Sequence, residues 1–164
     1  MKTIWFCGKD EKELTSIAEI IGEELINKDQ FVEIIVQGEV EEILGRGLGN
    51  SQEDRATFAD RLGFLGNLLH RNDVFALIVS NNATVEDRKL IKQNYGDYIQ
   101  INIGDFKDLL CDLDLSPKND VKENAKKVIE YLILEKVIPE KSQGAYSKEE
   151  EEEIRRRLEE LGYV

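Results

Sequence analysis

The residues from Gly8 to Thr15 have the spacing of a loop that could bind phosphate. In the motif G-x-x-x-x-G-K-[ST], backbone N–H groups and one lysine hold the phosphates of a nucleotide, and the final hydroxyl binds Mg²⁺. Gly8 and Thr15 occupy the first and last positions, but Glu13 replaces the second glycine and Leu14 replaces the lysine. A neutral branched side chain cannot neutralise phosphate charge. We therefore expect the frame of a phosphate site without its chemistry.

The same turn carries two additional carboxylates, Glu11 and Glu13. Like charges about 4 Å apart repel by roughly 4 kcal/mol at an effective dielectric near 20, so these side chains oppose a triphosphate. They favour the positive end of a helix, however, and Asp10 can cap the first free N–H groups with Glu13 as its capping-box-like partner. The sequence predicts a helix start closed by its own side chains, with no phosphate-sized hollow of inward-pointing N–H groups between Gly8 and Leu14.

Strands and helices alternate along the chain. Short apolar runs predict strands, and apolar residues spaced by three and four predict helices. The expected strands are Ile4–Cys7, Phe31–Val36, Asp73–Val79, Tyr98–Ile103 and a short fifth within Leu109–Leu115. The expected helices are Leu14–Ile26, Ser51–Arg71, a segment opening at Thr84 or Val85, and Asn119–Val137. This order predicts an α/β three-layer sandwich with a mainly parallel five-stranded sheet, in which Asp73–Val79 is central, plus a C-terminal helix.

Composition excludes several classes of partner. The net charge of −12 over 164 residues would repel nucleic acids and anionic membranes, so neither is expected to bind. No apolar run approaches the roughly 20 residues that span a bilayer, and the first residues lack a signal-peptide pattern. Cys7 and Cys111 lack metal-ligand spacing and are expected to be small buried side chains. The predicted location is the reducing cytoplasm.

Nothing in the sequence predicts a metal site or a catalytic residue. His70, the only histidine, falls near the carboxyl end of a predicted helix, where a charge role or plain exposure is the expected reading. A short helical turn and a glycine-containing loop are expected between Glu39 and Asn50, and this loop is not a specific motif.

Four segments together resemble the bacterial adenylyl-sulfate kinases, P-loop enzymes that phosphorylate the ribose 3′-hydroxyl of adenylyl sulfate with ATP. The segments are Thr3–Gly8 (TIWFCG), Gln37-Gly38-Glu39 (the family's Asp-Gly-Asp), Leu48–Arg55 (the family's L-G-F-S-x-x-D-R) and Glu86-Asp87-Arg88. The resemblance covers roughly Met1 to Leu134 and implies a P-loop NTPase-like fold.

The departures from this family fall at its active site. Besides the changes at the phosphate turn, Gln37 replaces the first aspartate of Asp-Gly-Asp and Asn50 replaces a phenylalanine expected near adenine. Phe58 and Asp60 stand where the family's N-I-R-R has its asparagine and first arginine. Ser80–Ala83 (SNNA) replaces the family's F-I-S-P substrate loop.

A lid is also missing. Only Gly104–Leu110 separates the expected fourth and fifth strands, where the family has a lid of several dozen residues that supplies arginine and lysine to ATP.

Five residues remain candidates for ligand binding. Gly8 and Thr15 belong to the phosphate turn, and Glu39 keeps the second carboxylate of Asp-Gly-Asp. Arg55 and Arg61 match substrate-side basic residues of the family. Both arginines could clamp a sulfate or phosphate, or could form ordinary ion pairs on a helix surface; the sequence leaves the two readings open.

The end of the chain has a different composition. We divide the chain into a kinase-like domain (1–138), a linker (139–145) and a C-terminal amphipathic helix (146–164) with a stripe of Ile154, Leu158 and Leu161. This tail resembles short C-terminal extensions of some bacterial sulfatases and other unrelated enzymes, which suggests a docking element. The alternative is a helix packed on its own domain. We expect docking on another copy or on a protein partner.

Three functions are compatible with these observations. The favoured one is a degenerate kinase retained as a regulatory or interaction module, with no cofactor. The second is a non-catalytic binder of adenylyl sulfate, a nucleotide or a sulfated metabolite, using Arg55, Arg61 and the loop Arg46–Gly49 (RGLG). The third is an active kinase using ATP and Mg²⁺, with Lys9 or Lys12 standing in for Leu14.

Overall fold

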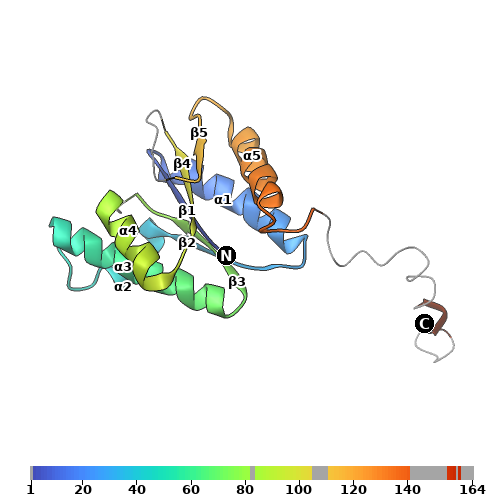
Figure 1. The fold of residues 1–164 in the computed structure, drawn as a ribbon, viewed down its shortest axis with the longest axis horizontal. Helices are drawn as coiled ribbons and strands as arrows, with labels where there is room; N and C mark the ends of the chain where they lie inside the picture. The colour runs from blue at the N-terminus through green and yellow to red at the C-terminus, as the bar shows by residue number, and fades with distance from the viewer. Residues whose placement is uncertain (1, 82–83, 105–110, 141–154, 158, 160–164) are drawn as a thin grey trace.

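The computed structural model describes residues 2–81, 84–104, 111–140, 155–157 and 159 (Figure 1). Five strands form one sheet in the order β2-β3-β1-β4-β5, and all four pairings are parallel. The strands are β1 (Thr3–Gly8), β2 (Phe31–Val36), β3 (Val74–Val79), β4 (Ile99–Ile103) and β5 (Leu113–Leu115). The helices are α1 (Glu11–Ile26), α2 (Gln37–Leu44), α3 (Gln52–Arg71), α4 (Val85–Tyr95) and α5 (Val121–Leu134). The predicted α/β class with a parallel five-stranded sheet is confirmed.

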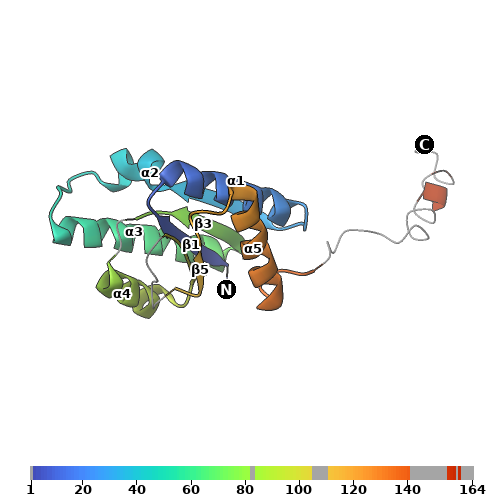
Figure 2. The ribbon, with the colours of Figure 1, turned by 90° about the horizontal axis from the view of Figure 1, so that it is seen from above.

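Helices cover both faces of the sheet. Figures 1 and 2 show α1 and α5 on one side and α3 and α4 on the other. Successive side chains of a strand point to opposite faces. Ile4 and Phe6 of β1 accordingly belong to the core under α1 and α5, whereas Trp5 belongs to the core under α3 and α4. Burial on both faces explains why β1 reads as a continuous apolar run rather than an alternating one.

The strand order corrects one prediction. The most apolar run, Asp73–Val79, was expected to be the central strand, but β1 occupies the middle of the sheet and β3 lies between β1 and β2. Both strands are paired on two edges and covered on two faces, so both have the same apolar composition. Apolarity identifies an interior strand and cannot rank its position.

The cysteine prediction also needs correction. Cys7 and Cys111 are not joined in a disulfide, and each is half-buried rather than buried. Cys7 lies at the carboxyl end of β1 and pairs in register with Asn102, where the sheet begins to open toward solvent.

Residues beyond α5 still contribute to the core. Ile138 is only 3% exposed and packs with residues of α1 and α5. The predicted linker and tail lie largely outside the described residues. In the tail, residues 155–157 and 159 are described, and they are helical. In the described part of the chain, no helix is long and apolar enough to cross a bilayer.

Candidate functional site

The carboxyl ends of the parallel strands meet along one edge of the sheet. In open α/β sheets, ligands bind outside this edge, where helices leave in opposite directions. Gly8 ends β1 there, and Ser80 follows its neighbour β3. The predicted phosphate turn therefore occupies the position that this fold class uses for ligands.

The turn itself is closed from within. Only Lys9 and Asp10 separate β1 from α1, which begins at Glu11. Oδ1 of Asp10 accepts hydrogen bonds from the backbone N–H groups of Lys12, at 2.9 Å, and Glu13, at 3.3 Å. This confirms the predicted cap, although among the described contacts only the Asp10 half of the capping-box pair is present. Two N–H groups that a phosphate loop would offer to an anion are bonded to the protein's own carboxylate.

Gly8 has a structural role at the same turn. Its N–H donates to Oδ1 of Asn81 at 2.8 Å. A Cβ atom at this position would lie 2.5 Å from the backbone carbonyl oxygen of Ile103, closer than real Cβ contacts. Glycine is therefore required by the close approach of β1 to the end of β4, whether or not a ligand binds.

The Leu14 side chain packs in the core, and the Thr15 hydroxyl forms a hydrogen bond within α1. The Leu14 side chain is 1% exposed and packs in the core under α1 and α5. Oγ1 of Thr15 donates to the carbonyl oxygen of Glu11 at 2.7 Å, a common bond for threonine inside a helix. The hydroxyl expected to meet Mg²⁺ is thus bonded within its own helix.

Other polar side chains at this edge bond to one another. Oγ of Ser80 donates to Oε1 of Gln37 at 2.7 Å, and Nε1 of Trp5 donates to the carbonyl oxygen of Ser80 at 3.1 Å. The Glu11 carboxylate lies against Gly38, where an added Cβ would be 2.7 Å from its Oε1 atom. Gln37, which stands in the place of the family's aspartate, thus links the end of β2 to Ser80, the residue after β3.

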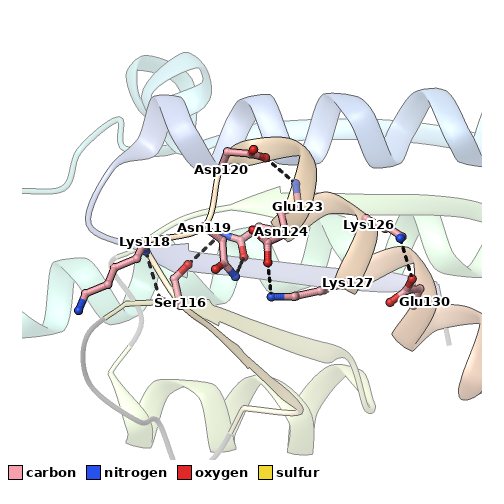
Figure 3. Close-up of polar contacts among 9 residues, drawn as sticks. All are labelled: Ser116, Lys118, Asn119, Asp120, Glu123, Asn124, Lys126, Lys127 and Glu130. Carbon is pink, nitrogen blue, oxygen red and sulfur yellow. Dashed lines mark hydrogen bonds and ion pairs between the residues drawn. The ribbon is translucent and has the colours of Figure 1, made fainter.

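The loop between β5 and α5 is held in the same way (Figure 3). Asn124 is fully buried; its Nδ2 donates to the carbonyl oxygen of Ser116 at 3.1 Å, and its Oδ1 accepts from Asn119 at 3.0 Å. Asp120 caps α5 by accepting from the N–H of Glu123 at 2.7 Å. This loop is fixed by the protein's own side chains.

A cleft of about 410 Å³ lies beside this edge, between α2 and α3. Its lining consists of Gln37, Glu41, Gly45, Leu48, Gly49, Asn50, Asp54, Arg55 and Phe58. Asp54 belongs to the predicted capping box with Ser51, and hydrogen bonds from Ser51 and Gly49 lower the pKa of its carboxyl. Arg55 is exposed, and its guanidinium forms no ion pair or hydrogen bond with the other described residues. The side chains of the cleft offer a small polar ligand one guanidinium, two amides and the two carboxylates of Glu41 and Asp54.

Arg61 and Glu39 lie outside the lining of this cleft. Nη1 of Arg61 donates to the carbonyl oxygen of Leu44, at the end of α2, and to that of Arg46 at 3.4 Å. These contacts favour a structural role, because the last carbonyl groups of a helix lack partners within it. Glu39 is exposed in the first turn of α2.

Sequence reasoning missed the use of two amide side chains. Gln37 and Asn81 were read as losses of family residues, but both form hydrogen bonds that close the carboxyl edge. The available signal was that Gln37 directly follows β2 and that Asn81 follows the end of β3 by two residues. Within the described residues, no group of three or more histidine, cysteine or acidic side chains is placed to hold a metal ion.

Known proteins match this chain over most of its length. The family model for adenylylsulphate kinase matches residues 1–135. The adenylyl-sulfate kinase of Gloeothece citriformis is 32% identical over 99 residues, which cover 60% of this chain and 56% of that protein. Matches to several such relatives span little more than half of the relatives' own length.

Solved structures agree. A structure of the Mycobacterium tuberculosis APS kinase superposes with a TM-score of 0.70 and 25% identity, covering 80% of this chain and 96% of that one. A second, of the same kinase in complex with AMPPNP and APS, has a TM-score of 0.67 at 21% identity, with the same coverage. Fold, motif order and family model agree: the chain belongs to the adenylylsulphate kinase family.

Proposed function

We propose that this protein is a catalytically degenerate adenylyl-sulfate-kinase-like protein that acts as a regulatory or interaction module. The observation that carries the proposal is the closed turn after β1. There α1 begins at Glu11, Asp10 accepts the N–H groups of Lys12 and Glu13, and Leu14 is buried where a kinase needs its lysine.

The charge at the turn after β1 and the short connection between β4 and β5 support the same conclusion. A triphosphate at this turn would meet Glu11 and Glu13 with no lysine at position 14 to offset their charge. Between β4 and β5 there are only nine residues, Gly104 to Asp112, which cannot form the lid that the family resemblance implies. The loss of one group can be compensated elsewhere in the site, whereas the joint loss of lysine, glycine, carboxylate and lid removes phosphate binding and closure together.

One observation favours a second function, a non-catalytic binder of adenylyl sulfate or a nucleotide. The α2–α3 cleft of about 410 Å³ is large enough for part of such a ligand, and Arg55 lines it. A guanidinium can bind a sulfate or phosphate through two parallel hydrogen bonds.

Thermal unfolding separates these functions. A ligand that binds only the folded state at 100 times its Kd adds about 2.7 kcal/mol of stability. We expect no shift in melting temperature with ATP–Mg²⁺ and no formation of 3′-phosphorylated adenylyl sulfate. A shift with adenylyl sulfate alone that disappears in Arg55→Ala would establish the binder. A shift with ATP–Mg²⁺, or turnover, would overturn the proposal and restore the kinase reading.

A further inference from the structure

A groove lies between α3 and α4, which run side by side on the face of the sheet opposite α1 and α5 (Figures 1 and 2). The two helices are in close contact at Gly63, where an added Cβ atom would lie 2.8 Å from Cγ2 of Ile91. Toward the amino end of α3 they enclose about 270 Å³ instead. The groove is lined by Glu53, Ala56, Thr57, Asp60, Asp87, Leu90, Ile91 and Asn94.

The floor of this groove is apolar. Ala56, Leu90 and Ile91 supply its apolar side chains. Ile91 is 2% exposed and belongs to the core beneath the groove, whereas Leu90 is 54% exposed. A leucine so exposed beside a hollow keeps apolar surface in contact with water. Burial of that surface against a partner would be favourable.

The charged side chains of the groove are all acidic. Glu53 and Asp60 come from α3 and Asp87 comes from α4, and the described lining contains no lysine, arginine or histidine. Asp87 is 8% exposed and caps α4, and Asp60 accepts a hydrogen bond from the Tyr95 hydroxyl at 2.9 Å. Glu53 is exposed and forms no ion pair with the other described residues. Carboxylates beside an apolar floor favour a partner that combines apolar with basic side chains, and they repel an acidic one.

The dimensions of the groove favour a helix as its occupant. Its walls extend over residues 53 to 60 of α3 and 87 to 94 of α4, which is about 10 Å along each helix at 1.5 Å per residue. Anchors at positions i, i+4 and i+7 of a bound helix cover the same length. The middle turns of two helices offer an extended peptide few backbone partners, whereas a bound helix satisfies its own backbone groups.

We infer that the α3–α4 groove binds a basic amphipathic helix of a partner protein. Apolar side chains from two turns of that helix lie on Leu90 and Ile91, and its lysine or arginine side chains face Glu53 and Asp60. The inference rests on the proposed function as an interaction module and gives the chemistry of the partner. The groove shares no lining residue with the α2–α3 cleft, so the two sites are tested on different residues.

Binding of a designed peptide to the full chain tests the inference. The probe is a fluorescently labelled helical peptide with leucines at positions i, i+4 and i+7 and lysines flanking them. The control peptide carries glutamates in place of the lysines. Fluorescence anisotropy in about 0.15 M salt should show saturable binding of the lysine peptide. Binding of the glutamate peptide should be at least roughly tenfold weaker, because like charges across an interface oppose association.

Matched substitutions locate the binding site. Leu90→Gln should weaken binding of the lysine peptide roughly fivefold or more, as expected for a central apolar contact. Leu134→Gln, at a position of α5 that is 75% exposed, is its control and should have no effect. Glu53→Lys should also weaken binding roughly fivefold or more. Glu19→Lys changes the net charge equally at an exposed position of α1, on the other face of the sheet, and should have little effect. Melting temperatures establish whether each variant is folded.

A measurement on the unsubstituted chain complements these variants. On addition of the lysine peptide, the amide chemical shifts of residues 53–60 and 87–94 should change most. The inference is overturned if the lysine peptide does not bind, if both peptides bind equally, or if the largest shift changes lie elsewhere. Equal losses in Glu53→Lys and Glu19→Lys would also overturn it, because the peptide would then respond only to the net charge of −12. None of these results involves ATP or adenylyl sulfate, so the proposed loss of kinase activity is tested separately by the melting and turnover assays.

Discussion

The backbone N–H of Gly8 donates a hydrogen bond to Oδ1 of Asn81 across 2.8 Å and joins the ends of the neighbouring strands β1 and β3. This N–H is the first donor of the phosphate-loop frame, and a side chain of the protein accepts it. Together with the Asp10 cap, it gives the turn internal acceptors in place of the oxygens of a nucleotide.

Removing this acceptor tests its contribution. Asn81→Ala should lower the free energy of unfolding by about 0.5–1.5 kcal/mol, toward the low end because Asn81 is exposed and water can replace it. Asn81→Asp keeps an oxygen at the same place and should lose less. Urea unfolding measures both. Equal losses in the two variants would mean that the bond to Gly8 contributes nothing.

The second prediction concerns Leu14. Because its side chain is 1% exposed, Leu14→Ala should cost about 2–5 kcal/mol and Leu14→Lys no less, since the new ammonium must be buried or must disrupt the helix. Neither variant should phosphorylate adenylyl sulfate. Leu134→Lys, at a position that is 75% exposed, should change stability by at most about 0.5 kcal/mol. Turnover by Leu14→Lys alone would show that the phosphate site is intact.

The strands and helix starts could be predicted because their signals are local. Alternation of apolar runs and amphipathic segments gave the sheet and its helices, and the capping boxes at Ser51 and Thr84 set the starts of α3 and α4 within a residue. The order of the strands could not be predicted in the same way. It depends on which edges pair, and β1 and β3 have equivalent burial.

The candidate site also combines features that local sequence predicts with features that depend on tertiary packing. Arg55 and Arg61 lie on one helix and looked equivalent in sequence, but they are six residues apart and therefore project in different directions. The position of α2 decides their roles, since its carboxyl end meets Arg61 while the cleft beside it meets Arg55. The position of α2 depends on tertiary packing, and no local sequence pattern indicates it.

The two arginines should accordingly respond differently to substitution. Arg61→Ala should cost about 1–3 kcal/mol, because the carbonyl groups of Leu44 and Arg46 lose a charged donor. Arg55→Ala should change stability by at most about 0.5 kcal/mol and should affect only binding in the cleft. Urea unfolding of both variants is the measurement. A larger loss for Arg55 would assign it an unrecognised structural contact.

The final prediction concerns alkaline pH. Burial, and secondly the hydrogen bond to Asp60, raise the pKa of Tyr95 above its ordinary value of 10.0. The folded state therefore favours the neutral phenol more than the unfolded state does. This contribution to stability is fully present below pH 10 and is lost as pH rises through the higher folded pKa. Ultraviolet titration of tyrosinate, with Tyr95→Phe subtracted, should reveal one late-titrating phenol. In Asp60→Asn its pKa should fall part of the way back, because burial remains while the carboxylate is gone. A Tyr95 phenol that titrates like a free tyrosine would show that neither its burial nor its contact with Asp60 persists in solution.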